Sequence, residues 1–156
     1  MAQKRGMYYE EFKEGDEFTS PARTITEADI VMFAGLSGDY NQLHTDEEFG
    51  KKTQFGKRIA HGLLGLSISS GLTQRTGITD GTVMAFLGLE WKFLAPIFIG
   101  DTIHVVQKIV SMRETKKPDR GIIGFETTVV KQDGTVAQQG VRTVMIARKP
   151  VASGNG

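Results

Sequence analysis

The chain contains no cysteine, which excludes disulfide bonds, thiolate zinc ligands and cysteine nucleophiles. It also has almost no net charge, because 19 Lys and Arg residues balance 18 Asp and Glu residues and leave a formal charge of +1. A chain with this balance has no long-range field that would attract a polyanion or an anionic lipid surface. We therefore expect neither nucleic acid nor a membrane as a main partner.

Long apolar runs are missing as well. The least polar long stretch, AFLGLEWKFLAPIFIG, contains Glu90, Lys92 and Pro96, and it is too short and too charged to cross a bilayer core of about 30 Å. The N-terminal stretch MAQKRGMYYEEFKEGDEF is charged throughout and lacks the apolar segment of a signal peptide. These features predict a soluble, cytoplasmic protein.

The 156 residues are enough for one domain that buries a sizeable core. No internal repeat and no interior linker is visible, so we expect a single domain over residues 1–150. The last six residues, VASGNG, have the composition of a disordered tail over 151–156.

The first half of the chain has mostly helical and irregular patterns. Thr24 and Glu27 have the spacing of a capping box, and the helix that follows should end near Gly38, because glycine adopts the left-handed cap conformation easily. Asp46 is expected to cap a short helix over DEEFGKK. The stretch HGLLGLSISSGLTQRTG (61–77) is apolar on nearly all sides, which is typical of a buried helix.

The second half resembles a β-meander. The segments TVMAFLGLEWKF, DTIHVVQKIVSM, GIIGFETTVVKQ and TVAQQGVRTVMIA are rich in Val, Ile, Thr and Phe, as strands are. Asp133-Gly134 indicates a hairpin with a type I′ turn. The predicted class is therefore α+β, with a long antiparallel sheet that covers one apolar helix.

The stretch SGDYNQLHTD (37–46) concentrates chemically active side chains between two predicted helices. Aspartate and histidine are both largely proton acceptors near neutral pH, so Asp39 and His44 form a candidate acid–base pair. The same residues are also compatible with ordinary turn and capping roles. A metal site of Asp39, His44, Asp46 and His61 has permitted ligand types, but the spacing matches no recognised zinc motif, and we expect no metal.

The longer run SGDYNQLHTDEEFGKKTQFGKRIAHGLLGLSISSGL (37–72) resembles the hydratase motif of the MaoC-like family, the (R)-specific enoyl-CoA hydratases of the hot-dog fold. That motif has Ser-Gly-Asp, a residue, Asn-Pro, a residue and His, followed by a short helix, a Phe (here Phe55) and then Ile-x-His-Gly (here residues 59–62). One departure is that Gln42 follows Asn41 where many members have proline. The resemblance implies a hot-dog fold, in which an antiparallel sheet wraps around a central apolar helix.

The resemblance also implies roles for individual residues. Asp39 and His44 would be the catalytic pair that adds water to a 2-enoyl-CoA or removes it from a 3-hydroxyacyl-CoA. Asn41 would orient that pair, and the backbone N–H of Gly62 would polarise the thioester carbonyl. The resemblance implies three further pocket residues: Phe55, Ser70 and Gly71. His61 is expected only to anchor the loop through a buried hydrogen bond.

Members of the MaoC-like family are dimers or larger. The resemblance therefore implies a homodimer or a dimer of dimers for this chain. The substrate is expected to be an acyl-CoA thioester of fatty acid metabolism, and no cofactor is expected beyond the coenzyme A of the substrate. One alternative is a hot-dog thioesterase or carrier-protein dehydratase, but those enzymes usually have Asp or Glu on the central helix, and residues 61–77 contain neither. Another alternative is a non-catalytic subunit that binds acyl thioesters.

Overall fold

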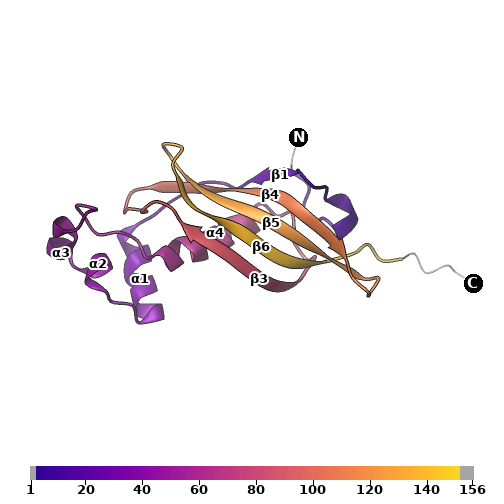
Figure 1. The fold of residues 1–156 in the computed structure, drawn as a ribbon, viewed down its shortest axis with the longest axis horizontal. Coiled ribbons are helices and arrows are strands. Elements are labelled where there is room, and N and C mark those ends of the chain that lie inside the picture. Colours follow the sequence, from indigo (N-terminus) through magenta and orange to yellow (C-terminus); the bar gives the residue numbers. More distant parts are fainter. Residues whose placement is uncertain (1–2, 152–156) are drawn as a thin grey trace, which may run out of the picture.

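A curved antiparallel sheet wraps around one long helix, and three shorter helices gather at one end of the molecule (Figure 1). The computed structural model of the chain describes residues 3–151. The expected tail therefore lies outside the described residues except for Val151. The elements are, in chain order, η1 (Tyr9–Glu11), β1 (Glu17–Thr19), β2 (Arg23–Thr24), α1 (Glu27–Ser37), α2 (Gln42–Thr45), α3 (Glu47–Lys52), α4 (Gly62–Arg75), β3 (Val83–Phe93), β4 (Thr102–Glu114), β5 (Arg120–Lys131) and β6 (Val136–Ala147).

The sheet has six strands in the order β1-β4-β5-β6-β3, and β2 also pairs with β4. The expected meander is right for β4, β5 and β6 but wrong for β3, which pairs with β6 instead of with the next strand, β4. The local pattern of β3 carries no information on its partner, because strand order depends on long-range packing. Because β6 is its one neighbour in the strand order, β3 forms one edge of the sheet.

Helix α4 is the centre of the core. Its buried face, which includes Leu64, Ile68 and Leu72, packs against inward-facing sheet residues such as Val105 and Val129. At Gly65 the helix approaches the sheet so closely that an added Cβ atom would lie 2.3 Å from Nε2 of Gln138. The α+β class and the hot-dog arrangement predicted from the sequence are therefore confirmed, and α4 lies within the predicted range 61–77.

Two local predictions are wrong in detail. The capping box of α1 uses Thr26 and Asp29, because Thr24 belongs to β2, where its hydroxyl lies 2.7 Å from that of Thr102. The hairpin at Gly134 is present, but among the described residues no non-glycine residue has a positive φ angle. A type I′ turn needs a positive φ at both central positions, so this turn is not type I′. The helix end at Gly38 and the cap at Asp46 are confirmed.

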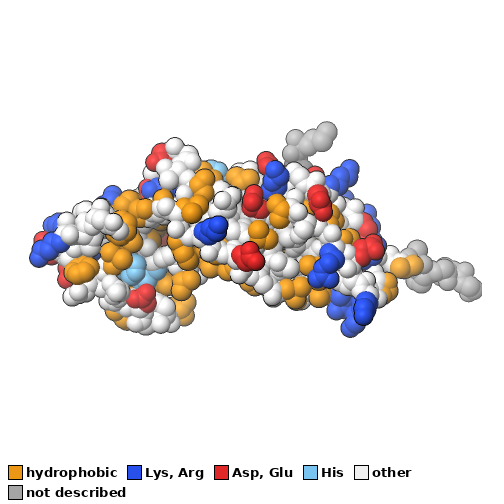
Figure 2. All heavy atoms as spheres, viewed as in Figure 1, with side chains coloured by type: hydrophobic (Ala, Val, Ile, Leu, Met, Phe, Trp, Pro, Cys, Tyr) orange, Lys and Arg blue, Asp and Glu red, His pale blue; other side chains and the backbone are white. Residues whose placement is uncertain are grey.

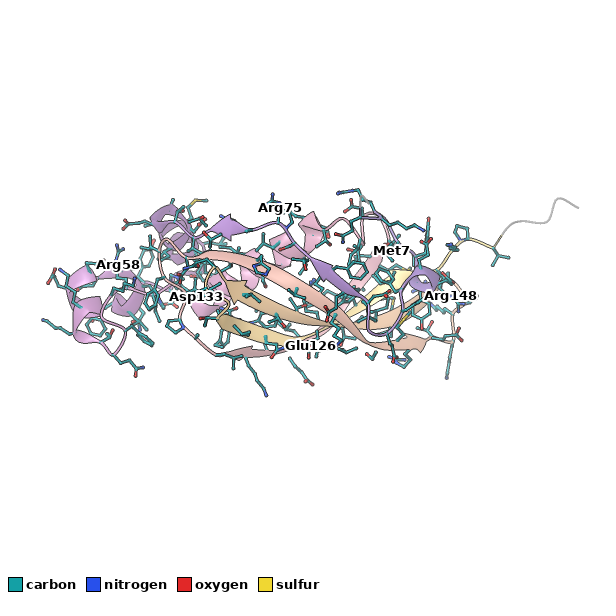
Figure 3. The ribbon with its side chains drawn as sticks, turned by 90° about the horizontal axis from the view of Figure 1, so that it is seen from above. Met7, Arg58, Arg75, Glu126, Asp133 and Arg148 are labelled. Atoms are coloured by element: carbon teal, nitrogen blue, oxygen red, sulfur yellow. The ribbon has the colours of Figure 1, made fainter. Side chains whose placement is uncertain are left out.

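The short helices are tied together by Arg58, which lies among them in Figure 3. Its guanidinium group binds Glu27 of α1 at 2.9 Å and Glu47 of α3 at 2.5 Å.

Among the described residues, no helix is long and apolar enough to cross a membrane.

Candidate active site

The predicted catalytic loop lies between two helix caps. Gly38 ends α1 with a φ of 76°, and the chain then turns through Asp39 to Asn41. The side-chain oxygen of Asn41 accepts a hydrogen bond from Leu43 N at 2.9 Å, which caps the four-residue helix α2. The backbone N–H of Asn41 donates to Oδ1 of Asp39 at 3.1 Å. Asn41 therefore holds both the carboxylate of Asp39 and the helix that carries His44.

His44 has one ring nitrogen bonded to the backbone, and the other makes no hydrogen bond within residues 3–151. The side chain is only 8% exposed, and its Nδ1 lies 2.8 Å from the carbonyl oxygen of Ile59. Because a carbonyl can only accept, Nδ1 is the protonated nitrogen. In the neutral ring Nε2 then carries the lone pair, and it is the atom that can exchange a proton with a substrate or water.

His61 contacts both His44 and the backbone of Asp39. Its ring stacks on that of His44 with centroids 3.8 Å apart, and its Nε2 donates to the backbone carbonyl of Asp39 at 2.9 Å. The side chain is 2% exposed. This is the buried anchoring hydrogen bond that the sequence predicts for His61, and it fixes the position of Asp39 relative to His44.

Three potential ligands for a metal ion also meet here. One ligand atom each from Asp39, His44 and His61 lies within 4.8 Å of the others. Nδ1 of His61 is buried and has no hydrogen-bond partner among residues 3–151. Asp46 is not part of this group, since its carboxylate caps α3 through Phe49 N at 2.9 Å. The same closeness is what an acid–base pair requires, because a water molecule between Asp39 and His44 can contact both side chains.

A cavity of about 410 Å³ opens beside this cluster, and apolar side chains form most of its wall. Figure 2 shows histidine atoms at the surface near the short helices, with apolar side chains around them. His44, Phe55 and Gly62 all line the cavity. Gly62 is the first residue of α4, so its backbone N–H has no acceptor within the helix and remains available to a ligand. A Cβ atom on Gly62 would lie 2.8 Å from the Phe93 ring, so glycine keeps this approach open.

Gln138 is a supporting residue that the sequence pattern does not predict. Its side chain is 2% exposed and donates to the carbonyl of Gly62 at 3.0 Å, while it accepts from Trp91 Nε1 at 3.0 Å. These bonds hold the start of α4 against β6. The sequence signal for Gln138 is a polar residue within a segment that otherwise has a strong strand pattern. In the structure this position faces α4.

Ser70 and Gly71 are not brought to this cavity. Both line a second cavity of about 470 Å³, beside the C-terminal half of α4. Since an α-helix rises about 1.5 Å per residue, Ser70 lies about 12 Å along the axis from Gly62. Within one chain, then, the structure brings together Asp39, His44 and Gly62 but separates Ser70 and Gly71 from them. Their role in the pocket stays a prediction.

The wall formed by residues 94–97 is held by a buried ion pair. Nζ of Lys131 lies 2.8 Å from a carboxylate oxygen of Asp101, and both side chains are about 10% exposed or less. Burial raises the pKa of Asp101, but hydrogen bonds from Gln132, Lys131 and the backbone N–H of Phe98 outweigh it and hold that pKa below its usual value. Lys131 also donates to the carbonyl of Pro96 at 3.3 Å, so the pair supports the cavity wall directly.

Three basic residues near the site, Lys51, Lys57 and Arg58, are engaged in contacts within the protein. Arg58 binds two glutamates, Lys51 binds Glu48 at 2.6 Å, and Nζ of Lys57 lies 4.3 Å from the centre of the Phe98 ring.

Gln42 stands where many MaoC-like proteins have proline, and the structure predicts that Gln42→Pro stabilises the chain. Gln42 is the first residue of α2, a position that proline favours because its N–H is not needed in the helix. Asn41 has φ −51° and ψ 136°, which suits a residue before proline. We expect the free energy of unfolding to rise by about 0.4–1 kcal/mol, measured by urea denaturation with Gln42→Ala as the control. A lower free energy of unfolding in Gln42→Pro would contradict this prediction, because the backbone N–H or the side chain of Gln42 would then make a stabilising contact.

The chain is similar to proteins of one family, and residues 11–131 match the MaoC like domain. The (R)-specific enoyl-CoA hydratase of Rhodospirillum rubrum is 35% identical over 139 residues, which cover 89% of this chain and 91% of that protein. The enzyme of the same name from Aeromonas caviae is 33% identical over 76% of this chain and 84% of its own length. The crystal structure of the MaoC-like dehydratase from Rhodospirillum rubrum has a TM-score of 0.85 and 29% identity, with 94% of this chain and 100% of that chain covered.

Proposed function

Because this chain belongs to the MaoC-like family, we propose that it catalyses the (R)-specific hydration of a trans-2-enoyl-CoA to the (R)-3-hydroxyacyl-CoA, or the reverse dehydration. The enzyme class is that of a hydratase or dehydratase, as the names of its relatives indicate. The observation that carries the specific reaction is that Asp39 lies close to His44, and that His44 and Gly62 both line an apolar cavity.

Each step of the reaction has a candidate residue. A water molecule held between the Asp39 carboxylate and Nε2 of His44 loses a proton to the pair and attacks C3 of the enoyl group. The electrons move to the thioester oxygen, where the N–H of Gly62 stabilises the enolate; a donor of this kind is typically worth about 10²–10³ in rate. The pair then delivers a proton to C2, which completes the addition of water. The apolar wall of the cavity suits the acyl chain.

A spectrophotometric assay tests this function. Purified protein is mixed with crotonyl-CoA, loss of the conjugated-thioester absorbance is followed, and the product is analysed on a chiral column. We expect rapid loss with formation of the (R)-3-hydroxy product. A thiol reagent in parallel samples detects free coenzyme A, so its release without hydration would indicate a thioesterase, and no change with short, long or branched enoyl-CoAs would favour a non-catalytic acyl-binding subunit.

A homodimer through the β3 edge is part of the same proposal. Strand β3 lies at the sheet edge, and large apolar side chains are exposed along it, among them Phe86 at 56%, Leu87 at 47% and Phe93 at 53%. An exposed, apolar edge strand favours pairing with another strand, and a second copy supplies an identical edge, as in the two-fold interfaces of most homodimers.

Leu87→Arg is therefore expected to convert the dimer to a monomer, because a charge at the paired edge opposes association. Light scattering coupled to size-exclusion chromatography measures the mass. Leu36→Arg is the matched control, since Leu36 is 86% exposed on α1, away from β3. A wild-type protein that is monomeric, or a Leu87→Arg variant that remains dimeric, would contradict an interface at β3.

A further inference from the structure

A second cavity, of about 470 Å³, lies between the C-terminal half of α4 and the inner face of the sheet. Its lining combines apolar and polar side chains from five elements. Residues that matter for its chemistry are Thr73, Phe86, Gln107, Phe125 and Arg142. None of them belongs to the catalytic cluster around Asp39.

Arg142 brings a positive charge into this cavity without an acidic partner. The side chain donates to Thr73 Oγ1 at 2.8 Å and lies over the Phe86 ring, 5.6 Å from its centre. No carboxylate of residues 3–151 pairs with it, and burial lowers the pKa of its guanidinium group. The other described arginines either form ion pairs or, like Arg75 and Arg113, are exposed to solvent. Within the described part of the chain, Arg142 is thus a half-buried arginine without a counter-charge.

Gln107 supplies a second unused donor to the same cavity. It occupies an inward-facing position of β4 between the buried residues Val105 and Ile109, and it is 3% exposed. Within the part of the chain that the structure describes, its Nε2 has no hydrogen-bond partner. A buried donor left unpaired typically costs about 1–3 kcal/mol, so a polar amide at a core position indicates an acceptor that arrives with a ligand.

The two side chains define the chemistry of that ligand. A guanidinium and an amide N–H group together suit a carboxylate, while Phe86, Phe125 and Val144 on the wall suit an aliphatic chain. A phosphate of coenzyme A fits less well, because phosphates are strongly hydrated and apolar side chains such as Val83, Phe86 and Val144 line the cavity. We propose, on the basis of the function proposed above, that this cavity binds a carboxylate at the far end of the acyl group, so that the enzyme acts on CoA thioesters of dicarboxylic acids.

The test measures binding rather than turnover. Isothermal titration calorimetry gives the affinity of the full chain for saturated CoA thioesters in matched pairs: succinyl with butyryl, adipyl with hexanoyl, suberyl with octanoyl and sebacyl with decanoyl. The series of lengths is needed because Thr73 lies about 16 Å along α4 from Gly62. In the wild type we expect the carboxylate-bearing member of at least one pair to bind about tenfold or more tightly than its partner.

The variants assign that preference to the two side chains. Arg142→Met keeps a long apolar side chain and should abolish the preference, and Gln107→Leu should reduce it several-fold. Arg113→Met, at an exposed position of β4, should leave it unchanged. Thermal unfolding of each variant verifies folding, and if Arg142→Met does not fold, Arg142→Gln replaces it.

Equal affinity within every pair in the wild type would overturn the proposal, as would a preference that survives in Arg142→Met. An equal loss of affinity for coenzyme A itself in that variant would also overturn it, because Arg142 would then bind a phosphate. Failure of the proposed reaction gives a different result. In that case the protein would bind the carboxylate-bearing thioesters more tightly but would hydrate neither their 2-enoyl forms nor crotonyl-CoA. The carboxylate site would then be present without hydratase activity.

Discussion

Asp39→Asn and His44→Ala are each expected to lower the turnover of crotonyl-CoA by about 10²–10⁴-fold. Asparagine keeps the shape of Asp39 and its contact with the Asn41 N–H but cannot accept a proton. Alanine at position 44 removes Nε2, the one ring nitrogen that is not bound to Ile59. Steady-state kinetics under saturating substrate measure the loss of kcat in each variant.

Asp46→Asn is the matched control for this pair. Asp46 lies two residues beyond His44, but its carboxylate caps α3, and asparagine caps helices equally well. Turnover should therefore remain near that of the wild type. We also expect the double variant Asp39→Asn/His44→Ala to be little slower than the worse single variant, since residues that act as a unit are not additive. Turnover near that of the wild type in either single variant would contradict the role of that residue.

Asp101→Asn is expected to lower the free energy of unfolding by about 3 kcal/mol at neutral pH. The substitution leaves the ammonium group of Lys131 buried without its partner, and breaking a buried pair from one side typically costs about 3–5 kcal/mol. Asparagine still accepts some of the hydrogen bonds that Asp101 receives, so the lower end of that range applies. Urea denaturation followed by circular dichroism measures the change.

The loss should depend on pH in a defined direction. The folded protein lowers the pKa of Asp101 from 3.8, so the unfolded chain takes up a proton first as the solution is acidified. The stability that Asp101 contributes is complete well above pH 3.8 and is lost as the pH falls through the lowered value. Wild type and Asp101→Asn should therefore converge in acid. A difference that stays constant or grows on acidification would show that the charge of Asp101 is not the cause.

A second substitution separates the ion pair from packing. Lys131→Met removes the other partner, so Asp101→Asn/Lys131→Met should be less destabilised than the sum of the single variants, because no unpaired charge remains. Simple additivity would mean that the two side chains act independently of each other.

The features that the sequence predicted well are those that depend on neighbouring residues. The ends of α1 and α3 follow from the backbone freedom of Gly38 and the side chain of Asp46, and each acts within a few residues. The apolar run in α4 predicts burial whatever covers it. The specific motif from residue 37 to residue 62 was enough to name the family, which the domain match over residues 11–131 shows.

The features that the sequence missed depend on contacts between distant segments. β3 pairs with β6 rather than with its neighbour in sequence, and nothing in its own residues distinguishes the two. Gln138 reaches Gly62 across 76 positions of the chain, so no local pattern could assign its partner. The distance between Ser70 and the catalytic loop follows only from the position of α4 in the fold.

Phe93 belongs to both the exposed sheet edge and the cavity beside His44. It ends the edge strand β3, it is 53% exposed, and it also lines the cavity beside His44. A second copy that pairs with β3 would order this side chain and so complete the wall against which substrate binds. By mass action the specific activity should then fall on dilution, at concentrations where the two copies separate, and excess substrate should hold them together.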